Sequence, residues 1–557
     1  MQKSKKIKPL AKWIIGSGIF IVLLVTAVLF WQFNKYRIIR NEIRHTVNKI
    51  SNGLYTIDYD KMHLDEVNGL LTVTNLTLKP DTAVFNKLKA EKKNPALLIQ
   101  LFIPELRITG IKTIKAITNN KIECAKVEIK NAKVELYAAD KSKDSTTAKP
   151  AKELYEQLLG KWKLIKADEV ITTNTSVAFI DISNNKKMAE ATGLSVALTD
   201  VWIDSLHSLD STRYLFAKKI LLKADKGIIK NKQGTYFYKF TGLEFTTGPG
   251  LFSIKNAEIT PWLNETEFAK AAVLQTDRFN FSFQDIVIKD INLPELMHGS
   301  LIARELIIRQ SNCKVFRDLS YPRDNKIRVG TYPQQQLMEM PIPVSIKKIV
   351  IADAFIEYKE FTPVSGDYGK VQFENANVVI THVTNIPIEI TADNNCVIVF
   401  NAGFHNLAKV NAQIILKLKD PQGRFLINGS ATGFDATKLN DLVKPMALAV
   451  IESGTINKVD FNYQCNNYGS DGTLVLLYDN LKLTLLKKNK DEIVLKKKVL
   501  ASVVANLLIK NANPLRKQEI RKAKLHYKRD PNRTFFNLIW KSILKGIKET
   551  IGMKSKD

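Results

Sequence analysis

The chain has 557 residues, of which 45% are hydrophobic, and a formal net charge of +28. This length and apolar content suffice for several ordinary domains or for one extended repetitive one. From residue 481 onward there are 21 Lys and Arg against 6 Asp and Glu, a balance that attracts polyanions such as nucleic acid or anionic lipid head groups. The four cysteines form no CxxC pair, which excludes a zinc ribbon and a thioredoxin-type redox site and leaves disulfide pairing open.

The first predicted element is a transmembrane signal anchor at residues 13–33, preceded by a basic tail at 1–12. Residues 13–31 carry no charge, and about 20 apolar residues cross a hydrocarbon core of roughly 30 Å. A tryptophan at each end suits the two membrane interfaces. No small-x-small cleavage site ends the stretch, which favours an uncleaved anchor over a removable signal peptide. The residues assigned to the anchor are Trp13, Ile14, Ile15, Phe20, Leu23, Leu24, Leu29 and Trp31.

The topology follows from the tail and the anchor. Lysines in the tail favour a cytoplasmic N-terminus, although the far flank of the anchor is also basic. No other stretch of comparable length is free of charge, so the rest of the chain is expected on the opposite side of the membrane. Directly after the anchor, Tyr36, Ile39, Ile43 and Val47 fall on one helical stripe, which predicts a juxtamembrane amphipathic helix at 34–52.

A repeated strand pattern dominates the remaining chain. In residues 127–137 apolar side chains alternate at Val127 and Ile129, Asn131 follows, and alternation resumes one residue out of phase at Val134 and Leu136. Alternation indicates a half-buried strand. A one-residue slip would turn the later side chains to the other face. An Asn or Asp at the slip tolerates a bulge that keeps the apolar set on one face.

Further copies of this pattern occur at uneven intervals, so the chain is no solenoid of fixed period. The residue at the phase slip, called the corner, is Asn75, Asn131, Asp200, Asn256, Asp290, Gln310, Asp353 or Asn375. In the copy at 349–358 we expect Ile349 and Ile351 to share one face, the corner at Asp353 to return Ile356 to it, and Val350 to point the other way.

The predicted fold is mainly β: an elongated, twisted β-sheet groove of repeated strands, with an N-terminal transmembrane helix and a C-terminal amphipathic helix. A first β-repeat region is expected at 53–316, interrupted by a mobile loop at 138–152 that has almost no bulky apolar residue. A proline-containing loop at 317–345 leads to a second β-repeat region at 346–530.

The chain ends in a basic amphipathic segment at 531–557. Its apolar residues fall on one helical face, and lysines lie opposite. This pattern is typical of a helix lying in a membrane interface, but it also fits a helix that covers the exposed edge of the sheet. Both interpretations stay open, and one helix can serve both purposes. The residues assigned to membrane docking are Phe535, Phe536, Ile539, Trp540, Ile543, Ile547, Lys541 and Lys545.

The sequence contains no local motif that is typical of a metal site, a catalytic nucleophile or a phosphate-binding loop. The seven histidines are too far apart for an HExxH or other local metal pattern. Residues 429–433 place Ser directly after Gly and therefore form no GxSxG nucleophile elbow. No phosphate-binding glycine loop is present. We therefore expect no catalytic residues, no metal site, no cofactor and no enzymatic activity.

Three regions resemble the AsmA-like family of membrane-anchored envelope proteins, which is related to TamB and to chorein-type lipid-transfer proteins. They are residues 51–60 followed by the strand at 71–78, residues 429–445 followed by 453–456, and residues 472–483. The resemblance implies an inner-membrane anchor and a β-groove, apolar inside, along which lipid acyl chains slide. The residues assigned to the groove face are Ile349, Ile351, Ile356, Val127, Ile129, Val134 and Leu136.

The expected function is that of a single-pass protein of the bacterial inner membrane with most of its chain in the periplasm. It would shield acyl chains for phospholipid transport between membranes, with membrane lipids and envelope proteins as partners. The alternative is a scaffold or assembly factor for outer-membrane protein biogenesis that carries no lipid. Nucleic-acid binding is suggested only by charge, because no recognisable module is present. The oligomeric state is left open.

Overall fold

The computed structural model describes residues 40–41, 44–45, 47–49, 51–65, 67–112, 119–138, 162–207, 210–231, 233–488, 495–497 and 509–553. The predicted basic tail, the anchor with its eight assigned residues, and nearly all of the predicted loop at 138–152 lie outside these residues. Strands make up 58% and helices 16% of the structure, which confirms a mainly β fold. In each of the two units described below, antiparallel and parallel strand pairs occur together, so the sheets are mixed, and the short β21 pairs only with β20.

The chain divides into two compact units. Unit 1 comprises Met1–Asn256 and Lys289–Gly299, and unit 2 comprises Ala257–Ile288 and Ser300–Asp557. The predicted proline-containing loop at 317–345 therefore lies within unit 2. The chain first passes from unit 1 to unit 2 within the strand β11 (Leu251–Pro261), returns to unit 1 at Lys289 and enters unit 2 again at Ser300.

Within the described residues, unit 1 includes ten complete strands and two complete helices. The strands are β1 (Tyr55–Asp58), β2 (Lys61–Asp65), β3 (Leu70–Pro80), β4 (Leu97–Thr109), β5 (Lys121–Lys130), β6 (Lys133–Ala138), β7 (Leu164–Asp181), β8 (Lys186–Ile203), β9 (Ala217–Lys230) and β10 (Tyr236–Thr246). The helices are α3 (Thr82–Ala90) and α7 (Leu293–Met297). Neighbouring strands pair antiparallel, except that β5 and β6 both pair with β7 in parallel.

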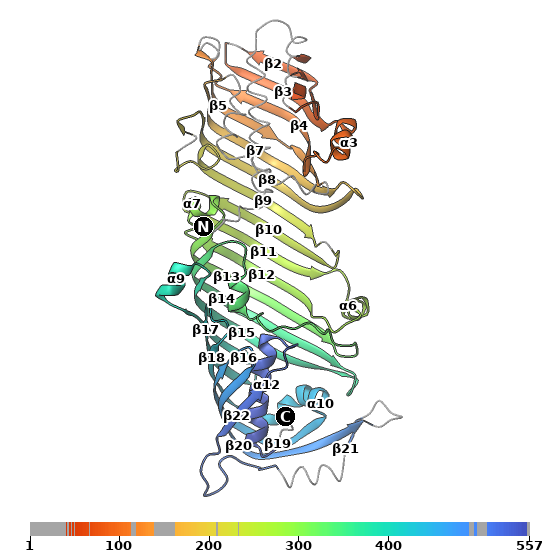
Figure 1. The fold of residues 1–557 in the computed structure, drawn as a ribbon, viewed down its shortest axis with the longest axis vertical. Coiled ribbons are helices and arrows are strands. Elements are labelled where there is room, and N and C mark those ends of the chain that lie inside the picture. Colours follow the sequence, from red (N-terminus) through yellow and green to blue (C-terminus); the bar gives the residue numbers. More distant parts are fainter. Residues whose placement is uncertain are drawn as a thin grey trace. The chain divides into compact units, whose positions relative to one another are not determined.

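Unit 2 contains the remaining strands and helices (Figure 1). The strands are β12 (Arg278–Lys289), β13 (Leu301–Asp318), β14 (Val344–Thr362), β15 (Asp367–Thr384), β16 (Asn395–Phe404), β17 (Ala408–Lys417), β18 (Phe425–Asp435), β19 (Ala449–Cys465), β20 (Gly469–Lys488), β21 (Leu495–Lys497) and β22 (Ala523–Lys528). The helices are α6 (Glu265–Ala272), α8 (Pro333–Met338), α9 (Pro387–Ala392), η2 (Ala436–Leu439), α10 (Asn440–Ala447) and α12 (Phe535–Thr550). From β14 to β20 the strands pair antiparallel in chain order, while β13 and β14 are parallel.

The predicted corners are a real feature of the backbone. Seven of the eight have the left-handed conformation, and the exception is Asn256. Their φ values are 52° at Asn75, 54° at Asn131, 56° at Asp200, 53° at Asp290, 48° at Gln310, 54° at Asp353 and 50° at Asn375. Asn and Asp tolerate this conformation better than other non-glycine residues, because a short polar side chain can bond locally.

Adjacent strands place their corners next to each other. The register runs from Arg309↔Ala352 to Asn312↔Phe355, so Gln310 and Asp353 lie in neighbouring positions of the parallel pair. In unit 1 the Asn174 side chain donates a hydrogen bond of 2.7 Å to Asn131. Asn174 also has a left-handed φ, of 51°, and was not among the predicted corners. In these two cases, left-handed residues therefore occupy neighbouring positions in adjacent strands.

Candidate functional site

The inner face of unit 2 is defined here as the face of β13–β20 against which α12 packs. Strand register aligns its side chains into rows that cross the sheet, because paired residues share a face. The first row consists of Leu306, Ile349, Ile380, Ile398, Ile414, Ile427 and Tyr463. The second consists of Ile308, Ile351, Val378, Phe400, Ala412, Gly429, Phe461 and Leu474. Neither row contains a charged or amide side chain.

The corner at Asp353 keeps this face apolar beyond the phase slip. Ile351 and Ile356 both pack against one small cluster formed by Ala354, Ala376 and Ala402. The predicted return of Ile356 to the face of Ile351 is thereby confirmed. A third row follows on the far side of the corner and consists of Cys313, Ile356, Phe373, Phe404 and Ala408.

The opposite face has a different composition. Val350 pairs with Ile307 and Val379, and the same row ends at Gln413, Asn428 and Asn462. The row beside it begins with Glu305 and Lys348. Over these three rows, one face of the sheet is apolar, whereas the other face combines aliphatic with polar and charged side chains. Unit 2 matches the expected alternation of a sheet with two distinct faces.

Burial along the apolar rows is uneven. At the β18–β20 end, Ile427, Tyr463 and Leu474 are at most 3% exposed. From β13 to β17 the first-row residues, including Ile349, Ile380 and Ile414, are only partly buried. Packed cores leave such side chains almost no access to solvent. In the described part of unit 2, the middle of the inner face therefore offers apolar surface for something else to contact.

The predicted groove residues of unit 1 have a different environment. Val127, Ile129 and Leu136 are 1%, 4% and 1% exposed, and Val134 is partly buried. Val127 and Ile129 belong to a hydrophobic cluster that also contains Val47, from the described helical residues between 40 and 49. At these positions the apolar face is a closed core. The helical residues of this segment support part of the predicted juxtamembrane helix.

Two arginines attach that helical segment to the sheet. Arg44 donates a hydrogen bond of 2.5 Å to the Asp58 carboxylate, and Arg40 donates to the backbone oxygens of Tyr59 and Asp60. Burial alone would raise the pKa of Asp58, but the Arg44 contact and the Tyr59 amide hold it below its ordinary value. The two guanidinium groups and Val47 together place the segment over the first strands of unit 1.

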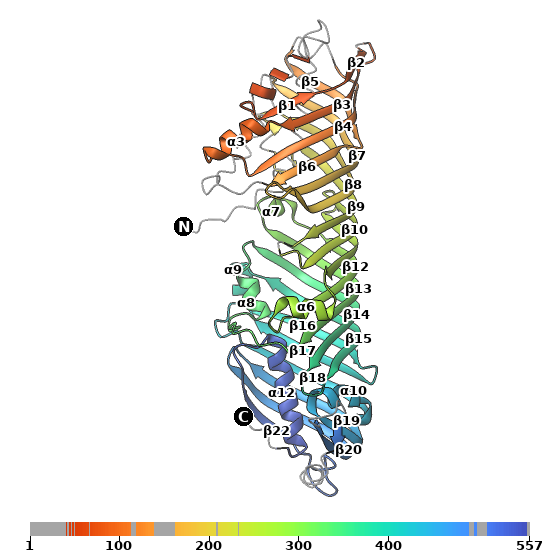
Figure 2. The same cartoon turned by 90° about the vertical axis from the view of Figure 1, so that its right-hand side faces the viewer.

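The C-terminal helix α12 lies against the face of β20 and β22 (Figure 2). Its buried side consists of Phe535, Leu538, Ser542, Gly546 and Thr550. Three of these residues are small and follow one another at intervals of four, which lets the helix approach the sheet closely. The Ser542 and Ser470 hydroxyls are 2.6 Å apart, and the Tyr463 hydroxyl donates to the Ser542 carbonyl at 3.4 Å.

The residues predicted to form a membrane-docking face are distributed around this contact. Phe535 is 6% exposed, whereas Phe536 is 73% exposed. Ile539, Ile543 and Ile547 are partly buried against the same core. Among the polar and aromatic members of the predicted set, Trp540 is partly buried, Lys541 is exposed, and Lys545 donates to the His526 carbonyl at 2.8 Å. The helix thus covers the face of the last strands and leaves Phe536 available to a further surface.

A cluster of aromatic and arginine contacts stabilises the start of α12, and it was not predicted from the sequence. Tyr332, which is fully buried, makes edge-on contacts with the rings of Phe425 and Phe535 at 5.6 and 5.2 Å. The Arg529 guanidinium lies 4.5 Å from the Tyr332 ring and donates to the carbonyls of Asn467, Arg328 and Arg533. Burial lowers the pKa of Arg529. Residues about 200 positions apart meet here, so no local pattern could have indicated the contact.

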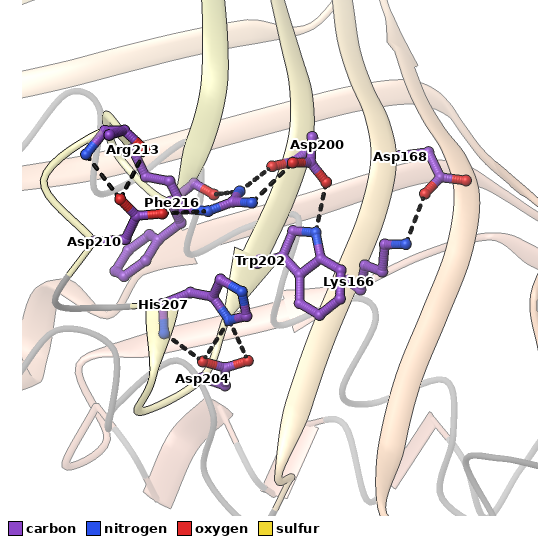
Figure 3. A network of polar contacts seen from close by, with 10 residues as sticks. Lys166, Asp168, Asp200, Trp202, Asp204, His207, Asp210, Arg213 and Phe216 are labelled. Atoms are coloured by element: carbon purple, nitrogen blue, oxygen red, sulfur yellow. Dashed lines mark hydrogen bonds and ion pairs between the residues drawn. The ribbon is translucent and has the colours of Figure 1, made fainter.

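Unit 1 contains a polar network around the corner at Asp200 (Figure 3). Trp202 Nε1 donates to Asp200 at 2.5 Å, and Arg213 donates to the same carboxylate at 2.8 Å. Lys166 and Arg213 lie 4.7 and 5.9 Å from the Trp202 ring. His207 Nδ1 is 2.8 Å from Asp204. Each of the charged groups named here has a protein partner, so the network ties the chain after β8 to the corner and presents no free nucleophile.

Reactive groups are scarce in the described part of the chain. No group of three His, Cys, Asp or Glu residues in it is placed to hold a metal ion. The four cysteines are free, and burial raises the pKa of the Cys124 and Cys465 thiols to about 12 and that of Cys396 to about 11. A thiol with such a pKa is neutral near pH 7 and is a poor nucleophile. The geometry supports contact with an apolar ligand better than a chemical reaction.

Comparison with known proteins does not name a family. No protein-family model and no curated protein matches the sequence. Within the described residues, helices are too short or too polar to cross a membrane. The resemblance to the AsmA-like family, the anchor and the cellular location therefore enter below as proposals.

Proposed function

We propose that the inner face of unit 2 shields lipid acyl chains, and that the protein serves phospholipid transport between membranes and envelope homeostasis. The single observation that carries this proposal is the apolar inner face itself. Its first two rows contain aliphatic, aromatic and small side chains from seven and eight consecutive strands, and they remain partly exposed between β13 and β17. A chain that exposes such a surface has a ligand or partner that covers it.

The dimensions of the face suit acyl chains. A row from β13 to β19 crosses six inter-strand gaps of about 4.8 Å each, a length of about 29 Å along the sheet. This is close to the hydrocarbon thickness of a bilayer, which is roughly 30 Å and accommodates two acyl chains end to end. Each methylene removed from water contributes about 0.8 kcal/mol. Contact with the rows therefore lowers the cost of holding a lipid tail outside a membrane.

The remaining features fit the same function. The uncharged stretch at 13–31 would anchor the chain in the bacterial inner membrane with most of its residues in the periplasm. The exposed Phe536 on α12 would contact a membrane or another envelope component. Movement along an apolar face needs no cofactor, and direction would come from a partner that supplies energy. A non-transporting assembly factor is the competing function.

The test compares purified full-length protein with two single variants. Phospholipid extracted from the protein is quantified by mass spectrometry, together with yield and protease resistance. We expect wild-type protein and Val350→Glu to retain phospholipid and Ile351→Glu to lose it while remaining folded, because a partly exposed face admits a carboxylate without burying it. Folded wild-type protein without phospholipid would favour the assembly factor. Degradation of Ile351→Glu would indicate that this face is a packed core.

A further inference from the structure

The segment between β13 and β14, residues 319–343, crosses the inner face of unit 2. The two strands are parallel, so the chain returns from the end of β13 to the start of β14. On the way it forms α8, which lies on the same side of the sheet as α12 (Figure 2). Leu337 and Met338 of α8 pack against the hydrophobic cluster that contains Ile427 of the first row. The segment is called the crossover below.

Two amide side chains hold α8 over the ends of β15 and β18. Asn385, which directly follows β15, donates hydrogen bonds to the carbonyls of Leu337 at 3.3 Å and Ile342 at 2.9 Å. Gln334 donates to the carbonyl of Gly423, two residues before β18, at 3.2 Å. The helix therefore spans the strand ends from β15 to β18.

Burial of the inner face decreases with distance from α8. The row of paired residues at these strand ends, called the end row, is Cys396, Leu416, Phe425 and Cys465, each at most 4% exposed. Tyr332, the residue before α8, contacts the Phe425 ring edge-on at 5.6 Å. The first row lies two residues farther along each strand, and its members Ile398 and Ile414 are only partly buried. The crossover thus covers one strip of an apolar face that is open farther from it.

The attachment of α8 is weaker than that of the residue before it. Tyr332 is fully buried, and its hydroxyl donates to the Asn466 carbonyl at 2.9 Å. The helix itself has six residues, a length that is not stable without packing. Gln334 is 2% exposed, and its Oε1 atom has no hydrogen-bond partner in the part of the chain that the structure describes, which raises the free energy of this arrangement. Met338 has a flexible apolar side chain that fits irregular surfaces.

We propose that α8 is a lid on the inner face, and that an acyl chain displaces Leu337 and Met338 when it binds to the end row and the first row. Tyr332 stays in place and marks the start of the moving part. This inference rests on the proposed function and adds to it a competition between α8 and the lipid for one surface. Two groups that compete for a surface weaken each other's binding by the same factor.

The test uses full-length protein, freed of bound lipid by detergent exchange, with dioleoylphosphatidylglycerol as the probe. Hydrogen exchange of peptides covering residues 333–340 is measured by mass spectrometry before and after the probe is added, with peptides from β22 as the internal reference. Affinity is measured by displacement of a fluorescent fatty acid. The tested variant is Met338→Ala. The matched control is Met340→Ala, which removes the same side chain from a position that is 42% exposed.

We expect the probe to increase exchange in residues 333–340 about fivefold or more, because lipid would replace the helix on the sheet. Met338→Ala should bind the probe about fivefold more tightly than the wild type, because its lid is open more often, and Met340→Ala should bind like the wild type. Ordinary binding without a lid would instead slow exchange near the ligand or leave it unchanged.

The outcomes separate the lid from the proposed function. If the probe binds and exchange in residues 333–340 slows or stays the same, the lid is wrong and the proposed function stands. The same holds if folded Met338→Ala binds no more tightly than Met340→Ala. If the wild-type protein binds no probe, both are wrong. If Met338→Ala does not fold, the exchange measurement on the wild-type protein decides.

Discussion

The corner at Asp353 provides a direct test of how the sheet keeps one face apolar. Its φ is 54°, and its exposed side chain makes no hydrogen bond or ion pair within the described residues. A substitution there acts on the backbone alone. We expect Asp353→Val to destabilise the β14–β15 pair by about 1–2 kcal/mol, because a β-branched residue in the left-handed region brings its side chain too close to the backbone. Asp353→Gly should be nearly neutral, since glycine adopts this φ without strain but gains entropy on unfolding.

Hydrogen exchange measures this effect locally, which matters in a chain with two units. Peptides from β14 and β15 should exchange about 5 to 30 times faster in Asp353→Val than in the wild type. Ala352→Val controls for the added side chain, because it lies beside the corner in ordinary strand geometry. Equal exchange in Asp353→Val and the wild type would refute a left-handed corner. Exchange that is faster in Asp353→Gly than in Asp353→Val would refute it as well.

Three further predictions concern stability and the last helix. A Cβ at Gly546 would lie 2.8 Å from that of Leu474, so Gly546→Ala should destabilise the contact of α12 with the sheet by about 1–3 kcal/mol through overpacking, against a gain of about 1 kcal/mol in helix propensity. The C-terminus should therefore be cleaved more readily by protease. Slower cleavage than in the wild type would contradict the close packing of α12 on the sheet. In unit 1, burial alone would raise the pKa of Asp200, but hydrogen bonds from Trp202 and Arg213 hold it below its ordinary value of about 3.9. The ionised Asp200 therefore adds to the free energy of unfolding above that value, and this contribution is lost as pH falls through the lower folded pKa. Asp200→Asn should make the stability of unit 1 depend less on pH when acid unfolding is followed by fluorescence. An unchanged pH dependence would count against the network. Phe536→Glu should weaken binding to anionic vesicles at unchanged thermal stability, whereas vesicle binding equal to wild type would limit α12 to covering the sheet.

The sequence predicts the strands and the direction of their side chains well, because both follow from local rules. Alternation and a corner residue together predicted that Ile351 and Ile356 share a face, and both contact Ala354 in one cluster. Seven of eight predicted corners have a left-handed φ. The same reasoning fails at Asn256, where the alternation is present but the backbone does not turn.

Other features depend on contacts that no local pattern encodes. The apolar pattern of the last helix emphasises Ile543 and Ile547, yet the closest approach to the sheet is made by Ser542 and Gly546, whose small size decides the packing. Tyr332 and Phe535 meet across a large separation in sequence. The burial of a row also depends on which other parts of the chain cover it. The same strand pattern places Val127 in a buried core and Ile351 on a partly exposed face.

The central claim is that lipid contacts the inner face of unit 2, and a photo-crosslinking amino acid tests it most directly. The probe is placed at position 351 or at the adjacent position 350, which point to opposite faces of β14 in the same strand. After irradiation of intact membranes, the purified protein is analysed by mass spectrometry for lipid adducts. The account predicts phospholipid adducts at position 351 and none above background at position 350. Absence of adducts at position 351, or equal amounts at both positions, would contradict it.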